Sequence, residues 1–419
     1  MAKGNVTDMK NKKVLIVGMG NSGKAAAQAM VKLGADVSVQ DNKSEDSIDP
    51  QLLTFLREKS VKCYLGCQPD DMSIFDMLIL SPGVSPELSF IKEAQAAGAE
   101  ITGELEIAYR VGHGNYVAIT GTNGKTTTTT LVGEIYKAAG KKTYVVGNIG
   151  VAVISKALSA EDDSWLVTET SSFQLETIRD FKPEVSAILN LTPDHLDRHK
   201  TMENYGKAKA AVFRNQTPDQ YCVINYDDEE CMKLVRDCKA KIVPFSRKKT
   251  LDFGVYVDGD TIIIKDEDGS IKEICRPVEL QIPGAHNLEN ALAACAIAYF
   301  GGIEPSVIAD VLRSFKGVEH RIELCGVIDD IRFVNDSKGT NPDAAVKAVL
   351  SFKNIILIAG GYDKGAEYGE LTGNFDGHVK ELVLMGDTAP KIREAAEKAG
   401  FEHFMMKEIH EQPKVVGDT

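Results

Sequence analysis

The sequence lacks the features of membrane and nucleic-acid proteins. It has no apolar run approaching the ~18 residues of a membrane-spanning helix, and its polar start contains no secretory apolar region. Basic residues are outnumbered, 48 against 61 acidic ones, so the formal net charge is -13. Such a charge repels phosphate backbones and anionic lipid unless a local basic patch intervenes. We therefore expect a cytoplasmic protein without membrane insertion and without a nucleic-acid partner.

The sequence also lacks a cysteine framework. Its eight cysteines include no CxxC pair, and the chain is far longer than a disulfide scaffold. Reduced, mostly structural thiols are expected. Cys63 and Cys67 are the closest pair, but two thiols without a further ligand make a poor metal site. Internal repeats are absent as well, and the one homopolymer, the threonine run at 126–130, lies where hydroxyl groups could cap a helix.

The composition is that of an ordinary globular protein. The chain has 419 residues, of which 43% are hydrophobic and 26% are charged. These values exclude disordered and fibrous classes, and at ~100–200 residues per domain the length allows two or three domains.

Short apolar strands alternate with helical segments along most of the chain. This alternation predicts an α/β fold with parallel sheets. Between residues 221 and 280 the pattern changes to short alternating stretches with turn signals, which predict a β-rich insert. The expected strands of the three α/β stretches are residues 14–17, 36–40, 77–80, 116–120, 165–168, 185–190, 331–334, 355–359 and 382–385.

The first strand leads into a GxGxxG turn at Gly18, Gly20 and Gly23. Such a turn lets the backbone approach a pyrophosphate at a helix N-terminus. Asp41 follows at close to the ~20 residues expected of an acid that binds a ribose hydroxyl. A nicotinamide or flavin cofactor, another pyrophosphate such as a nucleotide sugar, and a turn serving only strand-to-helix packing all remain open on this motif.

A second glycine loop has the sequence TGTNGKT and ends at Thr126. A strand, a glycine loop, a lysine and a hydroxyl residue at a helix start make a triphosphate cradle. Lys125 would neutralise phosphate charge, and Thr126 would offer its hydroxyl to Mg²⁺. The loop has fewer residues between its glycines than the common phosphate-binding loop, but a plain glycine turn would not need the lysine. We expect ATP here.

Polar residues follow the next strands of this unit. Glu169 is placed to contact a metal ion, or alternatively to cap a helix. His195 and His199 have the spacing of a zinc helix, but Leu196 stands where a metalloprotease has glutamate. His195 could instead bind Mg²⁺ or orient a reactant, with His199 at the surface or behind the site. Lys209 is, from its sequence context, an ordinary helix lysine.

The last third of the sequence adds two polar loops, each following a strand. Asp336, Lys338 and Thr340 lie on the first loop, and residues 360–364 form the second, which ends with Lys364. Lysines at neighbouring strand ends suit an anionic partner, a carboxylate or a phosphate, whereas solvated surface charge is the alternative.

These motifs, taken in order, resemble those of the Mur ligases, ATP-dependent amide-forming enzymes that build the peptidoglycan stem peptide. NDSK together with the first GxGxxG resembles the branch that adds D-glutamate to UDP-N-acetylmuramoyl-L-alanine. The resemblance covers most of the chain and is carried by TGTNGKTT, GNIG at 147–150, ETSSFQLE from Glu169, NLTPDHLDRH from Asn190, AHNLENALAA from Ala285, HR at 320–321 and NDSKGTN from Asn335.

The resemblance implies three domains and a monomeric enzyme. Residues 1–102 would form a Rossmann-like domain for the UDP-sugar, residues 103–317 a central P-loop-type ATPase domain, and residues 318–419 a Rossmann-like domain for the amino acid. In this family the first glycine turn serves the UDP group, which decides against NAD.

The resemblance also assigns roles to individual residues. Thr126, Glu169, His195 and a carbamylated Lys209 would hold two Mg²⁺ ions. The catalytic residues would be Lys125, Glu169, His195 and Lys209. ATP would contact Gly121, Thr122, Asn123, Gly124, Lys125, Thr126, Thr127, Asn287, Asn290, Arg321 and Asp336. The nucleotide sugar and its muramoyl-alanine end would contact Asn21, Ser22, Asp41, Asn42, Lys43, Gly83, Asn148, Ser171 and Gln174. The incoming D-glutamate would contact Lys338, Thr340 and Lys364.

The implied chemistry is activation of a carboxylate by ATP. The muramoyl-alanine carboxylate would attack the γ-phosphate to give an acyl phosphate, which the amine of D-glutamate would then displace. Lys125 and the magnesium ions would stabilise the charge that develops on the transferring group.

One departure concerns the C-terminal end. The family's third domain normally continues to a Ser-Pro-Ala-Cys-like loop that helps bind D-glutamate, whereas this sequence ends with residues 410–419 and has no such loop. The expectation is therefore an incomplete amino-acid site. Another Mur-type ligase, an inactive remnant that binds nucleotides, and an NAD-dependent oxidoreductase are the alternatives.

Overall fold

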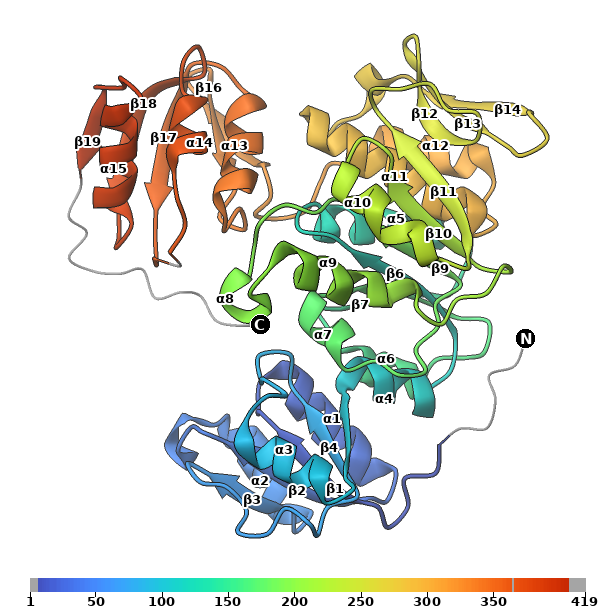
Figure 1. Cartoon of the computed structure of the whole chain (residues 1–419). Helices are drawn as coiled ribbons and strands as arrows, with labels where there is room; N and C mark the ends of the chain where they lie inside the picture. Colours follow the sequence, from blue (N-terminus) through green and yellow to red (C-terminus); the bar gives the residue numbers. More distant parts are fainter. Residues whose placement is uncertain (1–6, 364, 407–419) are drawn as a thin grey trace. The chain divides into compact units, whose positions relative to one another are not determined.

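The computed structural model describes residues 7–363 and 365–406 (Figure 1). By their internal contacts the residues form two compact units. The first comprises residues 1–274 and 292–311, and the second comprises residues 275–291 and 312–419. The division falls within helix α11 (Ala285–Phe300), and each unit is described by itself.

The N-terminal part of the first unit is a parallel sheet with the strand order β3-β2-β1-β4-β5. The central strand, β1, is apolar and buried from Val14 onward, as expected of a strand covered on both faces. The strands are β1 (Lys13–Val17), β2 (Asp36–Asp41), β3 (Lys62–Leu65), β4 (Met77–Leu80) and β5 (Glu100–Gly103). The associated helices are α1 (Asn21–Lys32), η1 (Glu45–Ser47), α2 (Pro50–Glu58) and α3 (Ser89–Ala96).

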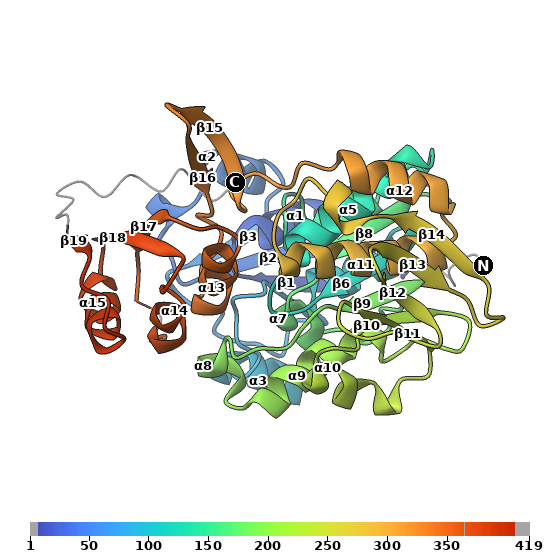
Figure 2. The ribbon, with the colours of Figure 1, turned by 90° about the horizontal axis from the view of Figure 1, so that it is seen from above.

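The larger sheet of the first unit has nine strands in the order β14-β13-β12-β11-β10-β9-β6-β8-β7 (Figure 2). The β-rich stretch expected between 221 and 280 is present, but it continues this sheet instead of forming a separate insert. Its strands β10 and β11 pair in parallel, and the sheet turns antiparallel only from β12 to β13. The bounds are β6 (Asn115–Thr120), β7 (Thr143–Gly147), β8 (Trp165–Glu169), β9 (Val185–Ile188), β10 (Tyr221–Asn225), β11 (Lys241–Ser246), β12 (Gly254–Asp258), β13 (Thr261–Lys265) and β14 (Ile271–Cys275).

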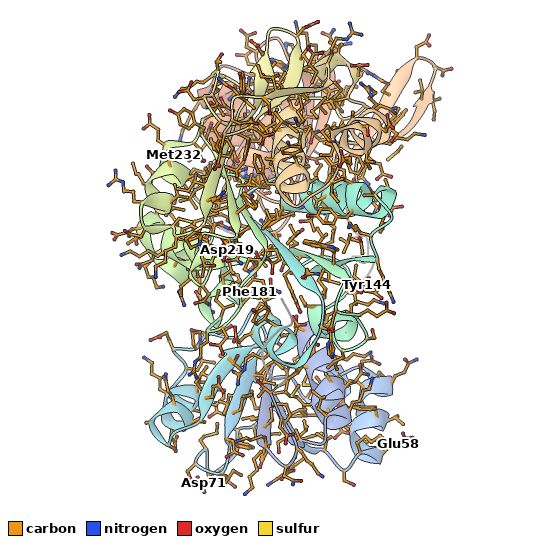
Figure 3. All side chains as sticks on the ribbon, turned by 90° about the vertical axis from the view of Figure 1, so that its right-hand side faces the viewer. Glu58, Asp71, Tyr144, Phe181, Asp219 and Met232 are labelled. Atoms are coloured by element: carbon orange, nitrogen blue, oxygen red, sulfur yellow. The ribbon has the colours of Figure 1, made fainter. Side chains whose placement is uncertain are left out.

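The core around this sheet is apolar and contains aromatic contacts. Tyr109, Tyr116 and Phe181 meet edge to face, with ring centroids 5.5–5.6 Å apart, and Figure 3 shows Phe181 among the side chains of this unit. The helices between and after the strands are α4 (Glu104–Val111), α5 (Lys125–Ala138), α6 (Val153–Ala157), α7 (Ser172–Glu176), α8 (Leu196–His199), α9 (Met202–Ala210), η2 (Ala211–Phe213), α10 (Glu229–Leu234), η3 (Val235–Asp237), η4 (Pro277–Glu279), α11 and α12 (Pro305–Ser314).

The second unit contains a parallel sheet in the order β17-β18-β19 and a separate antiparallel hairpin. The hairpin, β15 (Glu323–Ile328) and β16 (Ile331–Asn335), departs from the all-parallel arrangement that the alternation of strands and helices suggested. Pro342 occupies the first turn of its helix, where its fixed φ is favourable. The remaining elements are α13 (Pro342–Leu350), β17 (Ile355–Gly360), α14 (Gly369–Gly373), β18 (Val379–Met385), α15 (Ala389–Lys398) and β19 (Phe404–Met406).

The α/β fold class predicted from the sequence is confirmed. Across the described ranges, no helix combines the length and apolar character needed to cross a membrane.

Candidate active site

The phosphate loop connects β6 to α5 through two glycines with positive φ, Gly121 at 149° and Gly124 at 82°. A Cβ atom at Gly121 would lie 3.0 Å from the Cβ of Leu189, a tight contact, and the backbone conformation here is one that other residues rarely adopt. The N-cap of α5 is Gly124, without a side-chain cap. The expectation that the threonine run caps this helix is therefore wrong, because its residues lie inside α5. The uncapped helix N-terminus faces the loop, as an anion site requires.

The loop is held in place by Asn190, which follows β9. The backbone N–H of Asn123 donates to Oδ1 of Asn190 over 2.8 Å, and the Asn190 amide donates back to the carbonyl of Asn123 over 3.0 Å. Thr122 is fixed by its hydroxyl, which donates to the Thr192 carbonyl over 3.1 Å. Sequence reasoning did not assign Asn190 to the site, although it opens the NLTPDHLDRH motif.

Lys125 folds back over this loop. Its ammonium group donates to the carbonyls of Gly121 and Thr122 over 2.9 and 2.8 Å. A phosphate on the loop would meet a lysine that is already directed toward it. The position suits the charge-neutralising role expected from the motif.

Glu169 ends β8 and lies beside the start of α5, because Ile119 of β6 pairs with Glu169 in parallel register. Its side chain is buried, accepts from the Thr126 hydroxyl over 2.8 Å and accepts from the Asn148 amide over 3.0 Å. The alternative of a helix cap is wrong for Glu169, because Ser171 is the N-cap of α7. The structure thus brings together the hydroxyl and carboxylate expected at the magnesium ions and the amide expected at the muramoyl-alanine end.

Lys209 is 1% exposed, far from an ordinary helix lysine. Its Nζ atom donates to the carbonyl of Gly121 over 2.7 Å, the same carbonyl that Lys125 contacts, and lies 4.5 Å from the centre of the Tyr205 ring. Burial and the charge of Lys125 hold the pKa of Lys209 well below its usual range. Burial therefore disfavours the ammonium form at this position relative to an exposed lysine.

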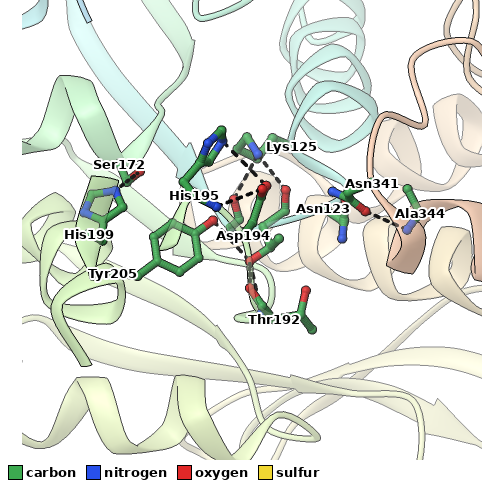
Figure 4. Close-up of polar contacts among 12 residues, drawn as sticks. Asn123, Lys125, Ser172, Thr192, Asp194, His195, His199, Tyr205, Asn341 and Ala344 are labelled. Carbon is green, nitrogen blue, oxygen red and sulfur yellow. Dashed lines mark hydrogen bonds and ion pairs between the residues drawn. The ribbon is translucent and has the colours of Figure 1, made fainter. Parts of the chain in front are cut away.

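His195 precedes α8 in a left-handed backbone conformation, with φ of 53°. Its side chain is 46% exposed, and its Nε2 atom lies 3.6 Å from Oδ2 of Asp194. Figure 4 shows His195 and Asp194 close to Lys125. His199 is buried, so the alternative that places it at the surface is wrong. Its ring nitrogens face Ser172 and Glu176.

The donor set of this region fits magnesium better than zinc. Within residues 7–363 and 365–406, no group of three His, Cys, Asp or Glu side chains could by itself hold a metal ion. Mg²⁺ commonly uses one or two protein oxygens together with substrate phosphates and water. The hydroxyl of Thr126 and the carboxylate of Glu169, which already lie in contact, are ligands of this kind.

Ser171 and Gln174 form a capping box at the start of α7. The Gln174 N–H donates to the Ser171 hydroxyl over 3.2 Å, and the Ser171 N–H donates to the Gln174 side chain over 2.9 Å. Gln174 also lines a small hollow, together with Ser81 and Pro82 after β4. Both residues thus have a structural role.

The first glycine turn is braced by Asp41. One carboxylate oxygen accepts from the N–H of Met19 over 2.7 Å, and the other accepts from the N–H of Lys43 over 2.8 Å. A Cβ atom at Gly23 would lie 1.9 Å from the Gly18 carbonyl oxygen, so this glycine is needed for strand-to-helix packing. The packing interpretation therefore explains Gly23, without excluding a ligand at the turn.

The other residues expected at the nucleotide sugar lie around this turn. Asn21 and Ser22 begin α1, and Asn42 accepts from the Gln40 amide over 3.2 Å. Lys43 is exposed. A Cβ atom at Gly83 would meet nothing within 4 Å, so packing does not explain that glycine.

In the second unit, the loop after β16 is tied to the residues before β15. Asp336 accepts from the Ile322 N–H over 3.1 Å, and the Lys338 N–H donates to the His320 carbonyl over 3.1 Å. Burial raises the pKa of Asp336. Arg321 donates to the Lys338 carbonyl over 3.5 Å. Arg321, Asp336 and Lys338 thus share one small cluster.

The last expected contacts also lie in the second unit. The Asn290 amide donates to Oδ1 of Asn287 over 3.1 Å, and the Asn287 amide donates to the Pro283 carbonyl over 2.7 Å. Thr340 is exposed. Lys364 lies outside the described residues.

Comparison with known proteins identifies the family. Three family models match: "Mur ligase MurD-like, N-terminal domain" at residues 12–103, "Mur ligase middle domain" at 119–298 and "Mur ligase, glutamate ligase domain" at 320–416. The UDP-N-acetylmuramoylalanine--D-glutamate ligase of Alkaliphilus oremlandii is 49% identical over 94% of this chain and 87% of that protein. The chain belongs to the Mur ligase family.

Other relatives agree with this assignment. The protein of the same name from Clostridioides difficile is 48% identical over 97% of this chain and 90% of its own. Among solved structures, MurF from Acinetobacter baumannii matches with a TM-score of 0.60 at 18% identity, covering 94% of this chain and 84% of that one. MurC from Thermotoga maritima matches with a TM-score of 0.57 at 21% identity, covering 94% and 90%. The two structures share the fold of this Mur ligase.

Proposed function

We propose that this Mur ligase joins D-glutamate to UDP-N-acetylmuramoyl-L-alanine in an ATP-dependent reaction of peptidoglycan precursor synthesis. The observation that carries the proposal is the phosphate loop on which Lys125 and Lys209 share the Gly121 carbonyl, beside the Thr126–Glu169 contact. The names and high identity of the relatives support the choice of substrates. The enzyme would act as a cytoplasmic monomer with the three domains expected from the motifs.

The reaction requires activation of a carboxylate, which is a poor electrophile toward an amine. The muramoyl-alanine carboxylate attacks the γ-phosphate of ATP and ADP leaves. The amine of D-glutamate then attacks the acyl phosphate, losing a proton as inorganic phosphate departs. Lys125 would stabilise negative charge on the transferring phosphoryl group, because its ammonium already points onto the phosphate loop.

Magnesium would be held by Thr126, Glu169 and His195, and by Lys209 in carbamylated form. Bound Mg²⁺ supplies charge stabilisation for phosphoryl transfer. Burial shifts Lys209 toward the neutral amine, which is the form that can add carbon dioxide, and the resulting carbamate is an anionic oxygen ligand. The modification would explain why a lysine lies buried against another lysine.

The substrates would bind to residues around the two glycine turns and on the β16 loop. Asn21, Ser22, Asp41, Asn42, Lys43 and Gly83 would contact the nucleotide sugar, and Asn148, Ser171 and Gln174 its muramoyl-alanine end. The ATP nucleoside and phosphates would contact the loop from Gly121 to Thr127, together with Asn287, Asn290, Arg321 and Asp336. Lysine side chains suit the carboxylates of D-glutamate. Lys338, which is exposed, and Lys364 would supply them, together with Thr340.

The decisive experiment is a coupled phosphate assay with ATP, Mg²⁺ and UDP-N-acetylmuramoyl-L-alanine. We expect phosphate release that depends on D-glutamate and is much slower with L-glutamate. Binding of ATP and the nucleotide sugar without any phosphate release would identify the chain as a binding-only remnant. Release with a different amino acid would instead indicate another Mur-type ligase.

The carbamate has its own test. Lys209→Ala removes the group that would carry it and should abolish turnover while leaving the fold intact. Short-chain carboxylates can enter the space and replace the missing oxygen ligand, so acetate or formate should restore part of the activity. Full activity of the variant, or no response to added carboxylates, would count against a carbamate.

A further inference from the structure

His199 occupies an unusual position beside the candidate site. It is 6% exposed, although it is the last residue of the short helix α8. Its Nε2 atom lies 2.9 Å from the Ser172 hydroxyl, and its Nδ1 atom lies 3.4 Å from Oε1 of Glu176. Ser172 and Glu176 are four residues apart on α7 and therefore share a helix face. A single imidazole thus spans α7 and fixes it to α8.

Phe173 connects this histidine to His195. The rings of Phe173 and His199 are stacked, with centroids 5.4 Å apart and an interplanar angle of 14°. The same Phe173 ring meets His195 edge to face at 4.9 Å. Arg198 places its guanidinium 5.2 Å from the ring centre. The orientation of Phe173 therefore depends on His199 and contacts His195 directly.

The imidazole of His195 needs such support because its own polar contacts are weak. A non-glycine residue at a φ of 53° is strained and persists where its surroundings hold it. Its side chain is half exposed, and its Nε2 atom lies 3.6 Å from Oδ2 of Asp194, whose closer contact, over 3.0 Å, is with the backbone N–H of His195. The Phe173 ring is the apolar surface that packs against the imidazole.

The same cluster reaches the N-terminal sheet through Arg198. This residue donates to Oε2 of Glu176 over 2.7 Å and to the carbonyl of Val84 over 3.2 Å. Glu176 therefore uses one carboxylate oxygen for Arg198 and the other for His199. Val84 follows Gly83, so the cluster also connects α7 with a segment proposed to contact the nucleotide sugar.

We propose that His199 is a positioning residue for the ligase reaction: acting through Phe173 and Ser172, it holds His195 and α7 in the geometry that turnover requires. The inference rests on the proposed function. His199 does not touch the reacting atoms, and its effect is on the orientation of groups that do. Groups that orient a metal ligand or catalytic side chain from behind typically contribute 10–100-fold to activity.

Two substitutions separate the polar contacts of His199 from its packing. His199→Phe keeps a ring stacked on Phe173 and removes both nitrogens. His199→Gln keeps a polar group that can reach Ser172 and removes the ring. Lys207→Ala is the matched control, because Lys207 lies on the adjacent helix α9 with an exposed side chain paired to Glu203.

The measurements are kcat, the KM for ATP, the Mg²⁺ concentration for half-maximal rate, and Tm. We expect His199→Phe to lower kcat about 10–100-fold and to raise the Mg²⁺ requirement. The KM for ATP should stay within about twofold, because Asn190 holds the phosphate loop independently of His199. His199→Gln should recover part of kcat, and Lys207→Ala should match the wild type.

A structural role would give a different result. In that case kcat of the folded protein would remain near the wild-type value, or kcat would fall together with Tm and ATP binding. Either outcome would overturn the positioning role. Ser172→Ala provides a second test, since it should lower kcat in the same way and add little to His199→Phe. Full additivity of the two substitutions would contradict a shared action. If the wild-type chain released no phosphate with D-glutamate, the proposed function would fail first, and with it this inference.

Discussion

The phosphate loop of the first unit and the β16 loop of the second unit both have lysines that we propose bind anionic substrates, but the surroundings of these lysines differ. Around the phosphate loop, Lys209 and Glu169 are buried, and Asn190 fixes the backbone from behind. On the β16 loop, Lys338 is exposed, and the turn is shaped by backbone hydrogen bonds and by the side chains of Asn335 and Asp336, which accept from the N–H groups of Ser337 and Ile322. Charges in the buried site act at low dielectric and without much reorganisation, whereas exposed charges are screened.

This difference predicts a division of labour. Substitutions at the phosphate loop should change the chemical step, because its groups are preorganised against developing charge. Substitutions on the β16 loop should change the binding of one substrate. The experiments below test that division, beginning with the largest expected effect.

Lys125→Ala should lower D-glutamate-dependent ADP release by about 10²–10³-fold, since it removes the cation directed at the transferring phosphate. The fold should survive, because Lys125 is only partly buried and its partners are the carbonyls of the loop itself. ADP release and Tm are the measurements. Lys137→Ala, at the exposed far end of the same helix, is the control and should have no effect. If Lys125→Ala retained turnover, the proposed role of the phosphate loop in the reaction would be contradicted.

Lys338→Ala should raise the KM for D-glutamate about tenfold and leave kcat nearly unchanged, as loss of one charged hydrogen bond predicts. The wild-type KM should also rise with ionic strength, because Lys338 is exposed. Initial-rate kinetics at low and high salt provide the measurement, with Lys353→Ala as an exposed control in the same unit. A fall in kcat with an unchanged KM would erase the contrast between the two loops.

Glu104 tests how strongly burial alone changes the pKa of a carboxyl group, and thereby the stability of the first unit. Its Oε1 atom accepts from the Ile154 N–H over 2.6 Å, while Oε2 has no hydrogen-bond partner among the described residues. Burial raises its pKa to about 7. The folded state therefore binds this proton more tightly than the unfolded state, so the contribution of Glu104 to stability falls as the pH rises from about 4.5 to about 7.

Glu104→Gln removes the titration and keeps an acceptor for Ile154. Relative to the wild type, the variant should gain about 2–3 kcal/mol in free energy of unfolding between pH 5 and pH 8. Denaturant unfolding at the two pH values measures this change. A stability difference that does not vary with pH would show that Glu104 stays ionised throughout.

Much of the fold could be predicted from the sequence because its signals are local. The apolar stretch after residue 12, the glycine turn and the alanine-rich helix follow from β-propensity, backbone freedom and periodicity, and they became β1 and α1. The strand pairing of residues 221–280 could not be read in this way. Parallel β10 and β11 join the main sheet through contacts distant in sequence, and local alternation does not specify a partner strand.

Most residues of the candidate site could be identified from the sequence, but the role of each residue could not always be. Ser171 was assigned to a ligand and also proves to cap α7, while Glu169 does not cap it. Asn190 contacts Asn123, and His199 contacts Ser172 on another helix. Both partners are distant in sequence, so the spacing of residues along the chain does not identify either position.

By itself, the sequence determined the α/β class, the two glycine loops and the resemblance to the Mur ligases, because these depend on the order of residues along the chain. Only the tertiary structure decided that Lys209 is buried against the Gly121 carbonyl and that His199 is enclosed between Ser172, Phe173 and Glu176. Burial and charge proximity set the ionisation and orientation of these side chains, and both arise where strands and helices distant in the chain pack together.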